Sequence, residues 1–423
     1  MKRRHWILGT AAAGLGAAAL LRPADRGAPH SAYFRALAAA LDDAGIGQPT
    51  LVVDQQRFDA NLRAIRARVP QVLPLRVVVK SLPSTSLVDA ACRAWNTERT
   101  MLFNGPQIVS VANARPKAQV LLGKPLNVRV ARQVLEQTAG KLAPAQIEWL
   151  VDTPGHLVQY RELARARREP MRLNFEIDVG LHRGGVEDAD TLARMFALLR
   201  EEPLLQWSGF MGYDAHAAGI PDLPGLRAKA MAEVHARYDA MVAVARAHAG
   251  VPIDRDALTF NSGGSHTLHL HDGRRSPNEI SVGSASVLPT DFEVPEQREL
   301  QPASFIATPV LKTMGDFRLP YGVEWIGRAA ATWDPNQAEA LAVHGGNWLA
   351  TPVSPAGVAP SGLFGPSSNQ QVMTAPYSAA LKADDWVFWR PHQSEAVFLQ
   401  FGDIAAYDGK AIAARWPVFE ASA

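Results

Sequence analysis

Residues 75–84 read LRVVVKSLPS, a stretch in which three valines lead directly to a lysine. β-Branched residues favour strands, and a short continuous apolar run is typical of a strand that is buried on both faces. A lysine after such a run marks the point where the strand reaches the edge of its sheet. Lys80 is therefore expected at a strand end, where its amine either extends to solvent along the rim or lies in an apolar pocket.

Seven further apolar runs follow, and stretches with helical periodicity separate them, most clearly at 191–202 and 225–250. The runs are TMLFN (100–104), QVLLGK (119–124), IEWLVDT (147–153), RLNFEID (172–178), QWSGFMGY (206–213), ALTFNSG (257–263) and EISVGS (279–284), and TLVVD (50–54) precedes them all. Eight strand–helix units predict an α/β protein with a (β/α)₈ TIM-type barrel. A doubly wound open sheet is the alternative, because a strand count does not establish closure.

The composition of the chain changes after residue 295. Residues 301–423 are rich in Pro, Gly, Thr, Val and Trp, and YDGKAIAARWPVF has the pattern of a hairpin with Asp408-Gly409 at its turn. The segment 345–371 is rich in Pro and Gly and is expected to be a long ordered loop. We therefore expect the barrel over residues 31–295 and a smaller β-rich C-terminal domain over residues 296–423.

Residues 1–30 have the pattern of a targeting segment. A basic start, MKRR, precedes a stretch from Trp6 to Leu21 without a charge, and Arg22-Pro23 follows. The pattern predicts a twin-arginine-like signal sequence or an N-terminal anchor, and an apolar N-terminal helix of a cytoplasmic protein is the alternative. A signal of this kind places the protein in the periplasm or cell envelope, with membrane contact only through this segment.

The charge balance and the cysteine count exclude several classes of protein. There are 43 basic and 41 acidic residues, so the net charge is +2. The chain therefore lacks the excess of positive charge that is typical of a protein that binds nucleic acid. The single cysteine, Cys92, excludes an intrachain disulfide and a multi-cysteine metal cluster. Cys92 lies in a helical pattern and is expected to be a small core residue. A small molecule is the expected partner.

Functional residues of a barrel gather at the carboxyl ends of its strands. Two Gly-Ser segments, NSGGSHT (261–267) and SVGSAS (281–286), follow the last two apolar runs, where barrels commonly hold a phosphate. Glycine lets the backbone approach an anion, while N–H groups and serine hydroxyls donate hydrogen bonds. A strand-end lysine in the same barrel mouth suggests pyridoxal 5′-phosphate held as a Schiff base on Lys80.

Seven motifs, in their order along the chain, resemble the D-threonine aldolase / D-serine dehydratase family. They are LVVD, VVVKS, NFEIDVGLHRGGV, GFMGYDAHAAG, NSGGSHT, ISVGSASVLPTDF and RPHQSEAVFLQFGD. These are fold-type III pyridoxal-phosphate enzymes related to alanine racemase, with a barrel followed by a β domain. The resemblance implies a lyase that acts on D-3-hydroxy amino acids, by aldol cleavage or by elimination of water, and it implies a homodimer.

The resemblance also implies roles for single residues. Lys80 matches the lysine that binds the cofactor, Arg183 an arginine of the cofactor site near the pyridine ring, and Tyr213 a strand-end tyrosine near cofactor and substrate. The phosphate loops are matched by Ser262, Gly263, Gly264, Ser265, Gly283 and Ser284. The structural alternatives are that Arg183 forms an ion pair with Asp178 and that Tyr213 is a core aromatic.

The catalytic base is not assigned by the resemblance, because the family's YHG is replaced here by YDAH (213–216). His216 is one candidate base near the pocket, and the others are Asp214, His266 and Lys80 itself. If the proton returns to the opposite face of the substrate, the same fold gives an amino-acid racemase. A non-catalytic pyridoxal-phosphate-binding envelope protein is the third possibility.

The chain departs from the family pattern beside the lysine and at the metal pair. Val78 and Leu82 occupy positions where relatives carry histidines. The relatives' late His-x-Asp or His-x-Cys pair, which binds a divalent ion, reads His392-Gln393-Ser394-Glu395 here. Serine is a poor ligand for manganese or zinc, so a metal site on His392 requires Glu395 or another carboxylate. His392 as a domain-interface histidine is the alternative.

Overall fold

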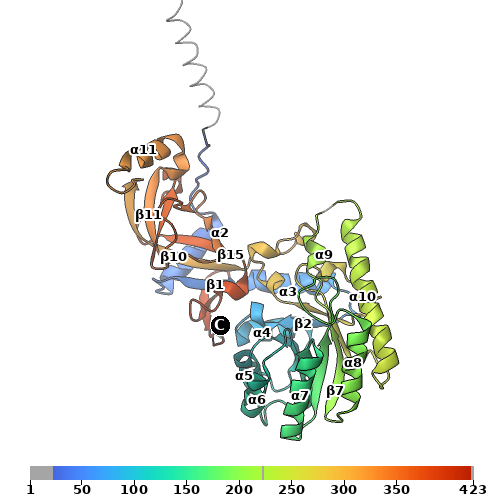
Figure 1. Cartoon of the computed structure of the whole chain (residues 1–423). Helices are drawn as coiled ribbons and strands as arrows, with labels where there is room; N and C mark the ends of the chain where they lie inside the picture. The colour runs from blue at the N-terminus through green and yellow to red at the C-terminus, as the bar shows by residue number, and fades with distance from the viewer. Residues whose placement is uncertain (1–21, 222, 421–423) are drawn as a thin grey trace, which may run out of the picture. The chain divides into compact units, whose positions relative to one another are not determined.

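The computed structural model describes residues 22–221 and 223–420, so most of the expected targeting segment lies outside the described residues. The described chain divides into two compact units (Figure 1). Residues 53–304, 392–404 and 415–420 form the barrel unit, and residues 22–52, 305–391 and 405–414 form the sheet unit. The two units do not follow the single domain boundary that was expected near residue 295. Residues 31–52 belong to the sheet unit, and residues 392–404 belong to the barrel unit.

Eight parallel strands of the barrel unit form a closed barrel. They are β2 (Leu75–Val78), β3 (Arg99–Leu102), β4 (Gln119–Leu122), β5 (Ile147–Val151), β6 (Met171–Glu176), β7 (Leu205–Met211), β8 (Thr259–Ser262) and β9 (Glu279–Val282). The first and last strands close the barrel, with Leu75 opposite Ile280 and Val77 opposite Val282. Each of the eight predicted runs overlaps one of these strands, with starts that differ by at most two residues. The TIM-type barrel is therefore confirmed and the open sheet is excluded.

Helix α3 (Gln55–Arg68) precedes the first barrel strand, and further helices of the barrel unit follow barrel strands. These are α4 (Thr85–Trp95), α5 (Gly105–Ala114), α6 (Val128–Gln137), α7 (Pro154–Arg167), α8 (Ala189–Arg200), α9 (His216–Gly219) and α10 (Leu226–His248). In α8 the buried residues Leu192, Met195, Phe196 and Leu199 follow the helical period and form one face. The Phe196 ring lies 5.2 Å from the ring of Trp207 in β7. Cys92 is buried in α4, as expected.

A buried ion network lies inside the barrel. The Arg76 guanidinium donates from Nε to Oε1 of Glu279 at 2.5 Å and from Nη2 to Oε2 at 3.0 Å. Arg99 Nη1 donates to the same carboxylate at 2.6 Å, and Asn261 Nδ2 donates to it at 2.8 Å. Burial by itself raises the pKa of Glu279, but attraction to Arg76 and Arg99 lowers the pKa below its usual value. The network fixes Asn261 at the carboxyl end of β8.

The sheet unit is built on a sheet to which the described residues contribute nine strands. They are β1 (Thr50–Asp54), β10 (Ser304–Asp316), β11 (Glu339–His344), β12 (Ala350–Ser354), β13 (Ala359–Pro360), β14 (Gln370–Ala375), β15 (Trp386–Pro391), β16 (Ile404–Tyr407) and β17 (Ile412–Trp416). Two helices, α2 (Ala32–Asp43) and α11 (Glu324–Trp333), complete the unit. Its core gathers Leu37, Leu41, Val52, Phe388 and Tyr407. The β-rich character expected of the later part of the chain is confirmed.

Two local expectations in the sheet unit are settled by the strand pairing. The hairpin of β16 and β17 is confirmed, and Asp408 Oδ1 accepts from the backbone N–H groups of Lys410 and Ala411 in its turn. The expectation of a long loop over 345–371 is wrong, because this segment contains β12 and β13. Proline is tolerated in β12 because this strand pairs with β15 on one side, as edge strands do.

Within residues 22–221 and 223–420, no helix combines the length and the apolar composition that a membrane span requires.

Candidate active site at the barrel mouth

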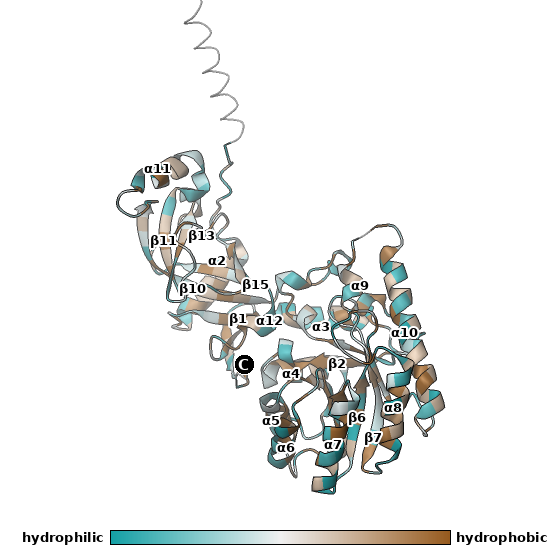
Figure 2. Ribbon diagram, viewed as in Figure 1, coloured by the Kyte–Doolittle hydropathy of each residue, from teal (hydrophilic) through white to brown (hydrophobic). Residues whose placement is uncertain are grey.

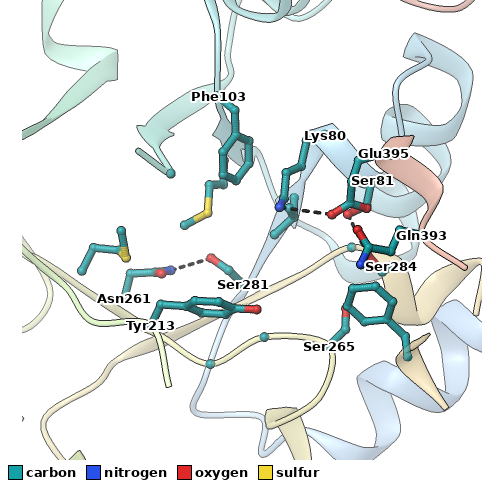
Figure 3. A pocket seen from close by; sticks show the side chains of 18 of the residues that line it. Lys80, Ser81, Phe103, Tyr213, Asn261, Ser265, Ser281, Ser284, Gln393 and Glu395 are labelled. Atoms are coloured by element: carbon teal, nitrogen blue, oxygen red, sulfur yellow. Dashed lines mark hydrogen bonds and ion pairs between the residues drawn. The ribbon is translucent and has the colours of Figure 1, made fainter. Parts of the chain in front are cut away.

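A cavity of about 260 Å³ opens at the carboxyl ends of the barrel strands (Figure 3). Side chains that follow β2, β7, β8 and β9 line it, together with residues 393 and 395 from the segment that returns to the barrel unit. The predicted site residues in the lining are Lys80, Arg183, Tyr213, Gly263, Gly264, Ser265, Gly283, Ser284 and Glu395. The barrel thus brings together residues that are far apart in the sequence.

Lys80 is directed into this cavity by the turn that ends its strand. β2 ends at Val78, and Val79–Ser81 form a single 3₁₀ turn in which Val79 and Ser81 are buried. The Lys80 Nζ lies 3.2 Å from Oε1 of Glu395 and 5.0 Å from the centroid of the Phe103 ring. A carboxylate and an aromatic face therefore hold the amine inside the mouth rather than along the outer rim. The apolar neighbour Leu82 is fully buried.

The loops after β8 and β9 form a cradle of hydroxyl and backbone groups. The Ser81 and Ser284 hydroxyls lie 2.8 Å apart, and Ser265 Oγ accepts from the Ala285 N–H at 3.0 Å. Ser265 and Ser284 both line the cavity. Serine hydroxyls and loop N–H groups are suitable donors to a phosphate, and they bring no side-chain charge of their own.

Glycine is required at two positions of this cradle because the backbone passes close to other residues. A Cβ atom on Gly264 would lie 2.8 Å from Cε2 of Tyr213. A Cβ atom on Gly283 would lie 2.8 Å from the carbonyl oxygen of Val78. Side chains at these positions would push into the walls that Tyr213 and β2 provide, so the cavity depends on both glycines.

Tyr213 and Arg183 lie on one wall of the cavity. The Arg183 guanidinium lies 5.1 Å from the centroid of the Tyr213 ring. Burial, and to a smaller extent the neighbouring Asp214 charge, raise the pKa of Tyr213. The phenol therefore remains protonated at neutral pH and can donate a proton. Because Tyr213 lines the cavity, it is more than a core aromatic.

The loop that carries Arg183 is organised by Asp178. Asp178 Oδ1 accepts from the backbone N–H groups of Gly180 and His182, and Oδ2 lies 2.6 Å from Nδ1 of His182. Burial raises the pKa of Asp178, but the hydrogen bonds from His182 and Gly180 outweigh it and lower the pKa overall. The ion-pair partner of Asp178 is thus His182, and Arg183 turns to Tyr213 instead.

A buried cluster around Asp214 lies behind the cavity wall. Asp214 Oδ1 accepts from Thr267 Oγ1 at 2.6 Å, and Oδ2 accepts from His271 Nε2 at 2.7 Å and from Ser262 Oγ at 3.1 Å. Burial by itself raises the pKa of Asp214, but attraction to His271 and these hydrogen bonds lower it. Asp214 therefore connects the end of β7 to the loop after β8, and its carboxylate does not face the cavity.

Three predicted site residues do not line the cavity. The Ser262 hydroxyl is turned away and donates to the Gly212 carbonyl and to Asp214. His216 begins α9, where its Nε2 faces the Gly180 backbone. His392 accepts at its carbonyl from the Asp291 N–H, and Gln393 rather than His392 contributes to the lining. Glu395, the second expected metal ligand, is paired with Lys80.

The cavity lining contains two polar residues to which the sequence analysis assigned no role. Asn261 Nδ2 donates to Ser281 Oγ at 2.7 Å, and both residues line the cavity. Figure 3 shows this pair beside Tyr213. The sequence could have identified Asn261 and Ser281 as site residues, because both are polar residues within apolar strands and both belong to the Gly-Ser motifs.

Glu176 is a second residue that sequence reasoning missed. It ends β6, and its carboxylate oxygens face the backbone of Gly184 in the Arg183 loop. Burial first, and then repulsion from Asp152, raise the pKa of Glu176 to about 7. The barrel mouth thus contains a carboxyl group that changes charge near neutral pH.

Comparisons with known proteins bear on the family and the fold of the chain. The family model described as alanine racemase, N-terminal domain, matches residues 53–288. No curated protein matches the chain significantly. Among solved structures, D-threonine aldolase from Filomicrobium marinum superposes with a TM-score of 0.70 at 17% identity, covering 88% of this chain and 96% of that chain.

Two further structures are similar in the same way. D-threo-3-hydroxyaspartate dehydratase from Delftia sp. HT23 has a TM-score of 0.68 at 16% identity, covering 88% of this chain and 98% of that chain. Alanine racemase from Bacillus anthracis, solved with bound L-Ala-P, has a TM-score of 0.65 at 13% identity with the same coverage of both chains. At such identities the likeness is one of fold.

Proposed function

The chain belongs to the family of the alanine racemase N-terminal domain, a family of fold-type III pyridoxal-phosphate enzymes, and we propose that it is a lyase acting on D-3-hydroxy amino acids. The observation that carries the proposal is the position of Lys80. Its amine lies in one cavity with the Gly-Ser loops after β8 and β9, and a carboxylate lies 3.2 Å from it. A nucleophilic amine, a phosphate cradle and a proton acceptor are the groups that this chemistry requires.

The residues of the cavity fit pyridoxal 5′-phosphate. When bound, this cofactor supplies an aldehyde for the amino group of the substrate and a ring that withdraws electrons from Cα. Lys80 would hold the aldehyde covalently, and Ser265 and Ser284 would hold the phosphate beside the backbone of Gly264 and Gly283. The absence of a side chain at both glycines leaves the walls formed by Tyr213 and Val78 in place beside the cavity.

Glu395 and Lys80 form the proton-transfer pair of the proposed reaction. Glu395 lies 3.2 Å from the Lys80 amine, close enough to exchange a proton with it during the reaction. In aldol cleavage, Glu395 would take the proton of the substrate's β-hydroxyl as the Cα–Cβ bond breaks, and Lys80 would return a proton to Cα, so that the products would be an aldehyde and glycine. In elimination, Lys80 would take the α-proton and protonated Glu395 would return a proton to the leaving hydroxyl.

A racemase is the second candidate, and one observation favours it. Lys80 and the protonated phenol of Tyr213 reach the same cavity from β2 and β7. Two proton-transfer groups on separate elements are what removal and return of an α-proton on opposite faces require.

The test begins with the purified protein reconstituted with pyridoxal 5′-phosphate. Borohydride reduction followed by peptide mass spectrometry should place the cofactor on Lys80, and Lys80→Ala should abolish the label. Lys124→Ala is the matched control, since Lys124 also follows a barrel strand but does not line the cavity. A label on another lysine, or none, would overturn the cofactor assignment.

Substrates then separate the candidate reactions. D-Threonine, D-serine and D-3-hydroxyaspartate should give an aldehyde with glycine, or a 2-oxo acid with ammonia, while the L-enantiomers should not react. Interconversion of enantiomers without a carbonyl product would instead establish the racemase. A labelled protein that is inert toward every amino acid would establish a non-catalytic pyridoxal-phosphate-binding protein.

A further inference from the structure

Large aromatic side chains are exposed around α11 of the sheet unit. The exposed fractions are 99% for Tyr321, 68% for Trp325 and 43% for Trp333, and Ile326 between them is 39% exposed. We refer to these four residues as the aromatic patch. Among residues 22–221 and 223–420, the exposed large hydrophobic side chains of the barrel unit are all aliphatic. Exposed clusters of large apolar side chains commonly mark a binding surface.

The two tryptophans of the aromatic patch lie on the outer face of α11, and Tyr321 lies just before this helix. Trp325, Ala329 and Trp333 are spaced four residues apart, so they share one face of α11, and all three are exposed. The inner face is packed closely, since Gly327 is buried and a Cβ atom there would lie 2.9 Å from the backbone nitrogen of Leu319. Figure 2 shows hydrophobic residues along α11. The helix is therefore fixed on one side and presents aromatic residues on the other.

The apolar N-terminal segment joins the described chain beside this helix. Arg22 Nε donates to the carbonyl of Trp333 at 3.1 Å. Asn336, just after α11, accepts at Oδ1 from the Arg26 N–H and donates from Nδ2 to the Ala24 carbonyl, both at 2.9 Å. The uncharged stretch from Trp6 to Leu21 thus ends one residue before a contact with the last residue of α11.

The charges around the aromatic patch are mixed. Arg22, Arg26 and Arg328 are exposed, and they are balanced by Asp25 and by the half-buried Glu324 and Asp334. Arginine at the edge of an aromatic surface can bind lipid phosphate groups.

We propose that the aromatic patch docks on the surface of a lipid bilayer, next to the point where the apolar N-terminal segment enters it. Tryptophan and tyrosine favour the membrane–water interface, because their rings are apolar and their N–H and O–H groups remain hydrated. An amphipathic helix with such a face lies in the plane of the interface. The proposal concerns the sheet unit and does not depend on the reaction of the barrel unit.

A site-specific fluorophore tests the proposal on the full chain. The native thiol of Cys92 is buried and burial raises its pKa to about 11, so it reacts slowly and a new surface cysteine can be labelled selectively. Trp325→Cys is labelled with an environment-sensitive dye and mixed with vesicles of phosphatidylcholine and phosphatidylglycerol. Val72→Cys is the control, since Val72 is equally exposed on the barrel unit at 68%.

The expected result is a blue shift at position 325 on addition of vesicles, with quenching by spin-labelled lipid, and neither change at position 72. If the chain binds vesicles and position 325 stays unchanged, the N-terminal segment anchors the protein alone and the proposal is wrong. A blue shift that rises with protein concentration in the absence of vesicles would also overturn it, because a second copy of the chain would then cover the patch.

A second pair of variants measures the contribution of the patch. Trp325→Glu with Trp333→Glu should weaken partition into vesicles by about tenfold, while Val72→Glu should leave it unchanged. The unfolding transition of each variant must stay close to that of the wild type for the comparison to count. Equal partition of the folded double variant and the wild type would refute docking through this patch.

Discussion

The Lys80 amine and the Glu395 carboxylate form an ion pair with 3.2 Å between Nζ and Oε1. Lys80 follows the first barrel strand, whereas Glu395 lies in α12 (Ser394–Val397), after the chain has passed through the sheet unit. Their side chains are 40% and 25% exposed. An ion pair this accessible stabilises a fold by about 1 kcal/mol or less, so we assign its importance to reactivity.

We expect Glu395→Gln to reduce turnover by about 100-fold or more, since the carboxylate that exchanges protons with Lys80 is lost. The unfolding free energy should change by less than about 1 kcal/mol, and cofactor binding should persist. Glu299→Gln is the matched control, because it removes a similarly accessible ion pair, with Arg68, outside the cavity. Equal turnover of Glu395→Gln and wild type would show that Glu395 transfers no proton.

Removal of divalent metal should leave activity unchanged. A metal on Glu395 would have to displace Lys80, and the adjacent Ser394 is buried and supplies a poor ligand. Steady-state rates are compared before and after treatment with a chelator. Loss of activity that manganese or zinc restores would contradict this expectation and would support His392 and Glu395 as metal ligands.

We expect Tyr213→Phe to retain the cofactor and its absorbance but to lose about 100-fold in turnover, because the protonated phenol is removed from the cavity wall. Tyr160→Phe is the control, since Tyr160 is also buried but donates to the Leu126 carbonyl beside the barrel. Similar turnover in both variants would reduce Tyr213 to a packing role.

The barrel could be predicted because each strand carries its own signal. Runs such as RVVVKS and EISVGS contain β-branched apolar residues at their centre, and parallel strands buried on both faces are rich in such residues. Closure required the pairing of β2 with β9, which no local pattern encodes. The strands at 350–354 and 359–360 were missed because proline suppresses the strand signal, although an edge strand tolerates it.

A site residue could be predicted only where its position at the end of a strand, or its match to a family motif, identified it. Lys80, Ser265 and Gly283 were found in this way. Asp214 was considered as a base, yet it lies behind the wall because His271, far along the chain, pairs with it. The pairing of Glu395 with Lys80 and the burial that shifts Glu176 are three-dimensional effects, and sequence patterns contain neither.

Asp214 and His271 should be important for stability as well as for the phosphate loop. Asp214→Asn disrupts a fully buried hydrogen-bonded cluster, and we expect a loss of about 1–3 kcal/mol in the free energy of unfolding, measured in denaturant. Affinity for pyridoxal 5′-phosphate should fall too, because the amide keeps only one acceptor oxygen where Ser262 and Thr267 each donate to a different carboxylate oxygen. Asp188→Asn is the control, because asparagine at this exposed N-cap of α8 can still accept the hydrogen bond from the Thr191 N–H. This substitution should change the free energy of unfolding little.

Glu176 should make stability depend on pH between about 4.5 and 7. Its pKa is about 7 in the folded protein and 4.5 as the reference value, so over this interval the folded state binds more protons than the unfolded state. The Glu176 carboxyl therefore makes its full contribution to the free energy of unfolding below the lower of these two pKa values. This contribution decreases as the pH rises and is lost above the higher pKa value. Across this interval the contribution of Glu176 to the free energy of unfolding falls by about 2–3 kcal/mol, a value that includes a reduction for the partial exposure of the carboxyl to solvent.

The variant Glu176→Gln isolates this contribution, because its amide does not titrate. The difference in unfolding free energy between variant and wild type should be constant below pH 4.5, shift in favour of the variant up to about pH 7, and then stay constant. Chemical denaturation at a series of pH values measures it. Glu187→Gln, an exposed carboxylate in the following loop, is the matched control. A difference for Glu176→Gln that does not change with pH would show that the Glu176 carboxyl is not perturbed by its burial.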